Sequence, residues 1–164
     1  MKRMSSLVFV AAAAACVIAS ILITPGRADS AASPIAVPEG YRQWELVGVA
    51  HDAGLDELRG VLGNAIAMKA YREGTLPFPD GTILAELAWK HVPSPEIGRV
   101  FVPGAATTVQ IMVKDSKKYA DTGGWGFGRF IDGKPVDEAQ RKTCFACHEA
   151  NVKAHDFVFT RYAP

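Results

Sequence analysis

Apolar and polar residues alternate along the segment 82–89, which is the two-residue period of a half-buried strand. One face of this strand would carry Ile83, Ala85, Leu87 and Trp89, and the other Thr82, Leu84, Glu86 and Ala88. The segment 107–113 repeats the pattern, with Thr107, Val109, Ile111 and Val113 on one face and Thr108, Gln110 and Met112 on the other. We therefore predict a strand in each segment. The polar residues Glu86, Thr108 and Gln110 fit the wet side of a half-buried sheet, and Leu84 and Met112 on the same faces favour a covered surface instead.

The rest of the mature chain adds both strands and helices. Strand or apolar patterns occur at 41–50 (after a short helical turn), 58–62, 125–130 and 156–162. Gly126 and Gly128 interrupt the third of these, which indicates close approach by another group. Helices are predicted at 64–73, with Asn64 as N-cap and Gly74 after the end, and at 137–148. The pattern predicts an α+β fold, mainly an antiparallel β-sheet with a few short helices, rather than a helix bundle.

The first residues differ in character from the rest. Lys2 and Arg3 precede an apolar run from Leu7 to Ile23, and small residues follow it. We interpret residues 1–28 as a signal peptide, with cleavage after Ala28 or alternatively after Ala32, and residues 29–40 as a flexible leader. A retained N-terminal membrane anchor is the alternative, because the run is long for a signal. An exported bacterial chain of this kind would be periplasmic.

The length, charge and cysteine content of the chain limit the number of domains and the kinds of partner and cofactor to expect. With 164 residues, the sequence predicts one folded domain, at residues 41–164. The net charge of +1 gives no indication of a nucleic-acid partner. Removal of the predicted signal leaves two cysteines, Cys144 and Cys147, which in an exported protein form a disulfide or hold a cofactor.

These two cysteines belong to the sequence Cys144-Phe145-Ala146-Cys147-His148, the attachment pattern of c-type haem. The thiols add to the two vinyl groups of one porphyrin edge, so they must lie about one helical turn apart. His148 then follows as the axial ligand of the iron. The sequence thus predicts one haem c, attached through Cys144 and Cys147. The other histidines of the mature chain, His51, His91 and His155, have no motif and are expected at the surface.

Several segments together resemble the cytochrome P-460 family, which includes the cytochromes c′-β. They are Tyr41-Arg42-Gln43-Trp44, Asp80-Gly81-Thr82, Val113-Lys114-Asp115-Ser116-Lys117-Lys118, Gly124-Trp125-Gly126-Phe127 and the tail from Cys144 to Pro164. The resemblance implies an antiparallel sheet, a homodimer, and one haem whose second axial position is open or water-filled. Some members oxidise hydroxylamine and carry a lysine bonded to the porphyrin, whereas others lack that bond and bind nitric oxide.

This sequence departs from the hydroxylamine-oxidising pattern at two positions. The resemblance places Glu86 where the cross-linking lysine is expected, and Gln110 where a carboxylate handles protons. Lys90 would replace that lysine only in a shifted register. The resemblance also places Arg59 close to the haem, although a surface ion pair fits this arginine equally well. Glu86, Gln110 and Arg59 are therefore the candidate distal-pocket, and potentially catalytic, residues.

The sequence favours two functions and is also compatible with a purely structural or vestigial haem. The first is a five-coordinate haem protein that binds or converts a small nitrogen species, with nitric oxide favoured over hydroxylamine because of Glu86 and Gln110. The second is a periplasmic electron-transfer cytochrome with a redox partner protein. Its iron would be six-coordinate, with Met68, Met112 or a histidine as the sixth ligand.

Overall fold

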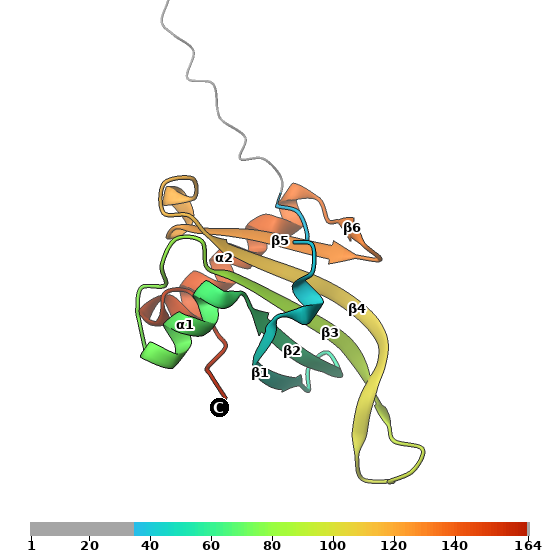
Figure 1. Cartoon of the computed structure of the whole chain (residues 1–164). Coiled ribbons are helices and arrows are strands. Elements are labelled where there is room, and N and C mark those ends of the chain that lie inside the picture. Colours follow the sequence, from blue (N-terminus) through green and yellow to red (C-terminus); the bar gives the residue numbers. More distant parts are fainter. Residues whose placement is uncertain (1–34, 164) are drawn as a thin grey trace, which may run out of the picture. The chain divides into compact units, whose positions relative to one another are not determined.

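The chain forms a six-stranded antiparallel sheet in which each strand pairs with the next along the sequence (Figure 1). The computed structural model describes residues 35–163. The strands are β1 (Glu45–Asp52), β2 (Glu57–Gly63), β3 (Ile83–Pro93), β4 (Phe101–Lys114), β5 (Trp125–Ile131) and β6 (Lys134–Pro135). The helices are α1 (Ala65–Glu73) and α2 (Glu138–Val152), with 3-10 turns at Tyr41–Gln43, Ala120–Thr122 and Lys153–His155. The predicted α+β fold, mainly antiparallel sheet, is confirmed.

The two faces of the sheet are those that the alternating pattern predicts. On one face Leu84 and Val61 belong to a buried cluster with α1, Phe78, Trp125 and Val158. On the other face Ala85, Ile111 and Phe130 form a second cluster. Successive side chains along β3 and β4 thus point to opposite faces of the sheet, as a period of two requires.

The second cluster is covered by the segment that precedes β1. Ile35, Val37, Tyr41 and Trp44 pack against it. Gly126 and Gly128 make this possible, because a Cβ at Gly126 would lie 2.7 Å from Ile35 and 2.4 Å from the Tyr119 ring. The close approach predicted for these glycines is confirmed.

Helix α1 begins and ends where the sequence indicates. The Asn64 side chain accepts a hydrogen bond from the Ala67 amide at 2.9 Å, and Gly74 ends the helix with φ of 63°. Met68 on this helix is 1% exposed and belongs to the core, so it is no candidate for an iron ligand.

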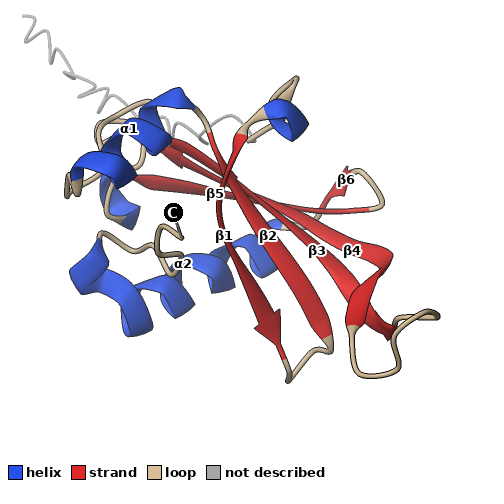
Figure 2. Cartoon of the chain, turned by 60° about the horizontal axis from the view of Figure 1, so that its bottom comes forward, coloured by secondary structure: helices blue, strands red, loops and turns tan. Residues whose placement is uncertain are grey.

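Helix α2 contains the whole haem motif and runs across the strands on one side of the sheet (Figure 2). The chain then turns back, but the strand predicted at 156–162 is wrong. Asp156 and Phe157 have φ of 48° and 64°, which no strand accommodates. The segment lies along β1 instead, where the Ala163 amide bonds to the Val47 carbonyl.

Two further expectations need correction. Strand β4 begins at Phe101, six residues before the predicted segment, and pairs with the end of β3 up to Pro93. His91 and His155 are half-buried, whereas His51 is exposed as expected. His51 and His91 hydrogen-bond to each other at 2.8 Å, which partly covers His91.

The predicted signal peptide, the alternative anchor and most of the leader lie outside the described residues. Within residues 35–163, neither α1 nor α2 is long and apolar enough to cross a membrane.

Candidate haem site

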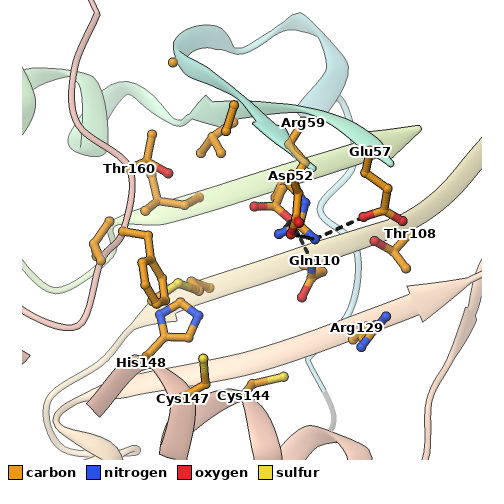
Figure 3. A pocket seen from close by; sticks show the side chains of 18 of the residues that line it. Asp52, Glu57, Arg59, Thr108, Gln110, Arg129, Cys144, Cys147, His148 and Thr160 are labelled. Atoms are coloured by element: carbon orange, nitrogen blue, oxygen red, sulfur yellow. Dashed lines mark hydrogen bonds and ion pairs between the residues drawn. The ribbon is translucent and has the colours of Figure 1, made fainter. Parts of the chain in front are cut away.

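A cavity of about 850 Å³ lies between the sheet, α2 and the final segment of the chain (Figure 3). Strands β1 to β5 all contribute to its walls. Figure 3 shows Cys144, Cys147 and His148 on one side, and Asp52, Arg59 and Gln110 on the strands across from them. The three motif residues and the three distal candidates therefore line one and the same cavity.

His148 is held in a defined orientation. Its Nδ1 donates a hydrogen bond to the Phe157 carbonyl at 2.6 Å, since a carbonyl oxygen only accepts. The neutral ring then carries its lone pair on Nε2, which is the tautomer that binds a metal. The rings of Phe127 and Phe159 flank the imidazole at 5.0 and 4.8 Å between centroids. Burial lowers the pKa of His148, although the Phe157 bond opposes this, and the neutral form is favoured.

Cys144 and Cys147 stand on the same side of α2, because residues three apart are neighbours on a helix. No disulfide joins them. Cys147 is exposed and Cys144 is half-buried. Burial raises the pKa of the Cys144 thiol, and the nearby positive charge of Arg129 acts in the opposite direction. Both sulfurs therefore lie on the cavity wall beside His148, and neither is joined in a disulfide.

The opposite wall brings together Glu86, Gln110 and Arg59. Glu86 and Gln110 are direct partners in the β3–β4 register, and the Gln110 amide donates to the Glu86 carboxylate at 2.7 Å. Arg59 Nη1 lies 3.7 Å from the same carboxylate oxygen. Arg59 therefore lines the cavity and also forms ion pairs with carboxylates of the same wall.

Two acidic residues that the sequence did not single out complete this wall. Asp52 and Glu57 each lie 3.0 Å from Arg59 Nη2. They face each other in the β1–β2 register, at the end of that hairpin. The sequence could have indicated them through the β1–β2 pairing, because this pairing puts Asp52 opposite Glu57, and Glu57 lies two residues from Arg59 on the same strand.

The charge of Glu86 is disfavoured in this setting. Burial is the largest cause and raises its pKa, with smaller contributions in the same direction from Glu57 and Asp52. Arg59 and the Gln110 hydrogen bond act against this rise. A buried carboxyl group with a raised pKa is a candidate for proton transfer.

The cavity separates the remaining candidate ligands into two groups. Met112 and His51 line it, whereas Met68, His91 and His155 do not. Lys90 is also outside, with its Nζ bonded to the Leu55 carbonyl. The register that puts Glu86, and not Lys90, on the cavity wall is therefore the observed one.

The residues of this cavity fit a haem. Within the described part of the chain, no group of three or more His, Cys, Asp or Glu side chains could hold a metal ion. A single imidazole suits an iron whose four other donors come from a porphyrin. Apolar side chains of Val61, Leu84, Met112, Phe127 and Val158 supply the walls that a flat, largely apolar group needs.

Comparison with known proteins gives one clear result. The family model described as Cytochrome P460 matches residues 38–160, which is most of the chain. The match covers every strand of the sheet and the whole of α2. No curated protein matches the chain.

Proposed function

The chain belongs to the cytochrome P460 family, which implies that it binds haem c, and on this premise we propose how it does so. One haem is attached through thioether bonds to Cys144 and Cys147, and His148 Nε2 ligates the iron. The observation that supports this most directly is the His148 Nδ1 bond to the Phe157 carbonyl, because it leaves Nε2 directed to a metal. When bound, the haem supplies an iron centre for ligand binding and electron transfer.

The side of the cavity across from His148 belongs to the small ligand in this proposal. Apolar residues such as Leu84 and Met112 would exclude water from this side, and no residue other than His148 would ligate the iron. Gln110 and Arg59 offer N–H donors for a bound ligand, and Glu86 is the group that can hold or release a proton there. The Arg59 ion pairs fix the guanidinium at the cavity wall.

We infer that the ligand is a small nitrogen species and that nitric oxide is favoured over hydroxylamine. The sequence has Glu86 in place of the lysine that cross-links in hydroxylamine-oxidising relatives, and Gln110 in place of a basic carboxylate. An amide cannot act as a base at neutral pH. The wall around Glu86 is suited to binding a small ligand and to supplying it with a proton from Glu86. It is less suited to removing protons from hydroxylamine, because Gln110 cannot act as a base.

The experiment that tests this proposal is intact mass analysis of the protein produced together with a haem-attachment system. The expected mass is that of the mature polypeptide plus one haem, and peptide mapping should place it on the segment with Cys144 and Cys147. A Cys144→Ala/Cys147→Ala variant should carry no covalent haem. A His148→Ala variant removes the proposed iron ligand. His91→Ala is its matched control, because His91 lies outside the cavity. A colourless wild-type protein would refute the proposal.

The electron-transfer function remains the second candidate, because Met112 and His51 line the cavity. Either would make the iron six-coordinate. A reduced spectrum of low-spin type that carbon monoxide and nitric oxide leave unchanged would favour this function and a redox partner protein. A Met112→Leu variant that then bound either gas would identify the sixth ligand.

Export to the periplasm and a homodimer are further parts of the proposal. Residues 1–28 have the composition of a signal peptide, and haem c is attached after export. N-terminal sequencing of the periplasmic protein should begin after Ala28 or Ala32. A start at Met1 in a membrane fraction would instead favour an anchor.

A further inference from the structure

A buried ion pair lies behind the candidate axial histidine, outside the cavity. Lys114 Nζ is 2.8 and 3.0 Å from the two carboxylate oxygens of Asp156. The two side chains are only 6% and 9% exposed. Lys114 also donates to the Gly123 carbonyl at 3.1 Å and lies 5.0 Å from the centre of the Trp125 ring.

The same carboxylate determines the course of the chain after α2. Asp156 Oδ2 accepts a hydrogen bond from the Phe78 amide at 2.8 Å, so the turn is tied both to β4 and to the loop before β3. Asp156 and Phe157 both have left-handed backbone angles, which need support from their surroundings. Lys114 and the Phe78 amide provide that support.

The next residue along the chain connects this turn to the site. Phe157 supplies the carbonyl that accepts the His148 Nδ1 proton. Its ring fits over Gly123, where a Cβ would lie only 2.3 Å from the ring. The position of the Phe157 carbonyl thus depends on a turn that Lys114 and Asp156 hold in place.

We propose that Lys114 and Asp156 are positioning residues for His148, which through the Phe157 carbonyl set the strength of the Nδ1 hydrogen bond and thereby the donor strength of Nε2. The inference rests on the proposed axial role of His148. A strong Nδ1–H···O bond makes the imidazole more electron-rich, which stabilises ferric over ferrous iron. A looser turn weakens the bond and should raise the reduction potential.

A purely structural ion pair would give a different result from a positioning pair. It would change the stability of the protein and leave the iron–histidine bond unaltered. A pair that acted on the iron only through its charges would shift the potential in opposite directions when either charge was removed. A positioning pair should weaken the iron–histidine bond whichever partner is lost.

The test uses the haem-loaded protein and the charge-conserving variant Lys114→Met/Asp156→Asn. Its net charge equals that of the wild type, and no unpaired charge is left in the interior. We expect full haem content, a higher reduction potential and an iron–histidine stretching band at lower frequency in the resonance Raman spectrum of the ferrous protein. Lys69→Met/Glu73→Gln is the matched control, because it removes an exposed lysine–glutamate pair on α1.

Two outcomes would overturn the inference while the proposed function stands. One is a haem-loaded double variant with the potential and the stretching band of the wild type. The other is that Lys114→Met and Asp156→Asn, tested singly, shift the reduction potential in opposite directions and leave the stretching band unchanged. If the double variant does not fold, Asp156→Glu carries the test, because it keeps the ion pair and displaces the turn. An unchanged band in Asp156→Glu would also refute the inference, whereas a wild-type protein without thioether-bound haem would refute the proposed function itself.

Discussion

Glu86 is the residue at which the sequence resemblance indicates the clearest departure from the hydroxylamine-oxidising members of the family. Its carboxyl group is largely removed from water, receives the Gln110 amide and has Arg59 nearby. Burial outweighs these favourable partners, so its pKa in the folded protein is raised above the ordinary value of 4.5. The folded state therefore binds the Glu86 proton more tightly than the unfolded state does.

This difference predicts how stability depends on pH. The contribution of protonated Glu86 is fully present below about pH 4.5 and is lost as the pH rises through the raised folded value. Urea unfolding of the wild type should show this decline, and Glu86→Gln should reduce it. Glu73→Gln, on the exposed face of α1, controls for the loss of a carboxylate. Parallel profiles for the wild type and Glu86→Gln would contradict the raised pKa.

A second prediction concerns the position of Glu86 relative to the haem. A Glu86→Lys variant places an amine at the position that the resemblance assigns to the family's cross-linking lysine. We expect a lysine–porphyrin bond on haem loading, seen by peptide mapping and by a shifted absorption band. Lys90 serves as an internal control, because it lies on the same strand but outside the cavity. An unchanged spectrum of Glu86→Lys would show that residue 86 does not reach the porphyrin edge.

Single residues of the site were predictable where a motif or a strand period identifies them. The haem motif singled out Cys144, Cys147 and His148. The two-residue period put Glu86 on the same face as Leu84 and Gln110 on the same face as Met112, and whether these faces are wet or covered stayed open until the structure showed that they line one cavity. The Phe157 carbonyl was not predictable, because a backbone group carries no sequence signal. Its place depends on contacts between residues far apart in the chain, such as Lys114 with Asp156.

At the scale of elements, Asn64 connects two parts of the fold. Its Oδ1 caps α1 and accepts from the Ile83 amide at 3.2 Å, while its Nδ2 donates to the Gly81 carbonyl at 2.8 Å. The start of α1 and the start of β3 are thereby tied together. Since β3 carries Glu86, this one side chain supports the distal wall of the cavity.

We predict that Asn64→Ala lowers the free energy of unfolding by about 1–2 kcal/mol, the usual cost of losing an N-cap. Asn64→Asp keeps the accepting oxygen for the Ala67 amide and should cost less. Chemical denaturation of both variants measures the difference. Equal losses in the two variants would show that the bond to the Gly81 carbonyl, and not the cap, is what matters.

Local patterns were sufficient for the elements that have regular periods and clear ends. Strand β3, the second half of β4, β5, and the helices α1 and α2 all occur where the sequence indicated them. The strand prediction at 156–162 is wrong because aromatic and β-branched residues, such as Phe157, Val158 and Phe159, are typical of strands but do not determine one. Buried Asp156 bonds to Lys114 and to the Phe78 amide, and these tertiary contacts hold a turn that the local pattern does not show.

At the scale of the molecule, the two faces of the sheet have different roles. One face packs against residues 35–44. The other face packs against α1 and, with α2 and the final segment, encloses the cavity. The long β3–β4 hairpin projects beyond the other strands of the sheet (Figure 1). Near its tip, Ile97, Val100 and Phe101 are 59%, 42% and 50% exposed. Apolar side chains gathered in this way are typical of contact surfaces.

We predict that the homodimer implied by the family resemblance uses this hairpin. Ile97→Ser/Phe101→Ser should shift the protein from dimer to monomer in sedimentation equilibrium, without loss of haem. Ile66→Ser is the control, since Ile66 is a similarly exposed apolar residue on α1. A dimer that persists in the hairpin variant would place the contact on another surface, and a monomeric wild type would contradict the dimer itself.

The central claim is that His148 alone ligates the iron of a thioether-bound haem, with the position toward Glu86 and Gln110 open. The visible absorption spectrum of the reduced protein, recorded before and after addition of nitric oxide, tests it most directly. The account predicts a high-spin, five-coordinate spectrum that changes on addition of the gas. A low-spin spectrum that nitric oxide leaves unchanged would contradict it.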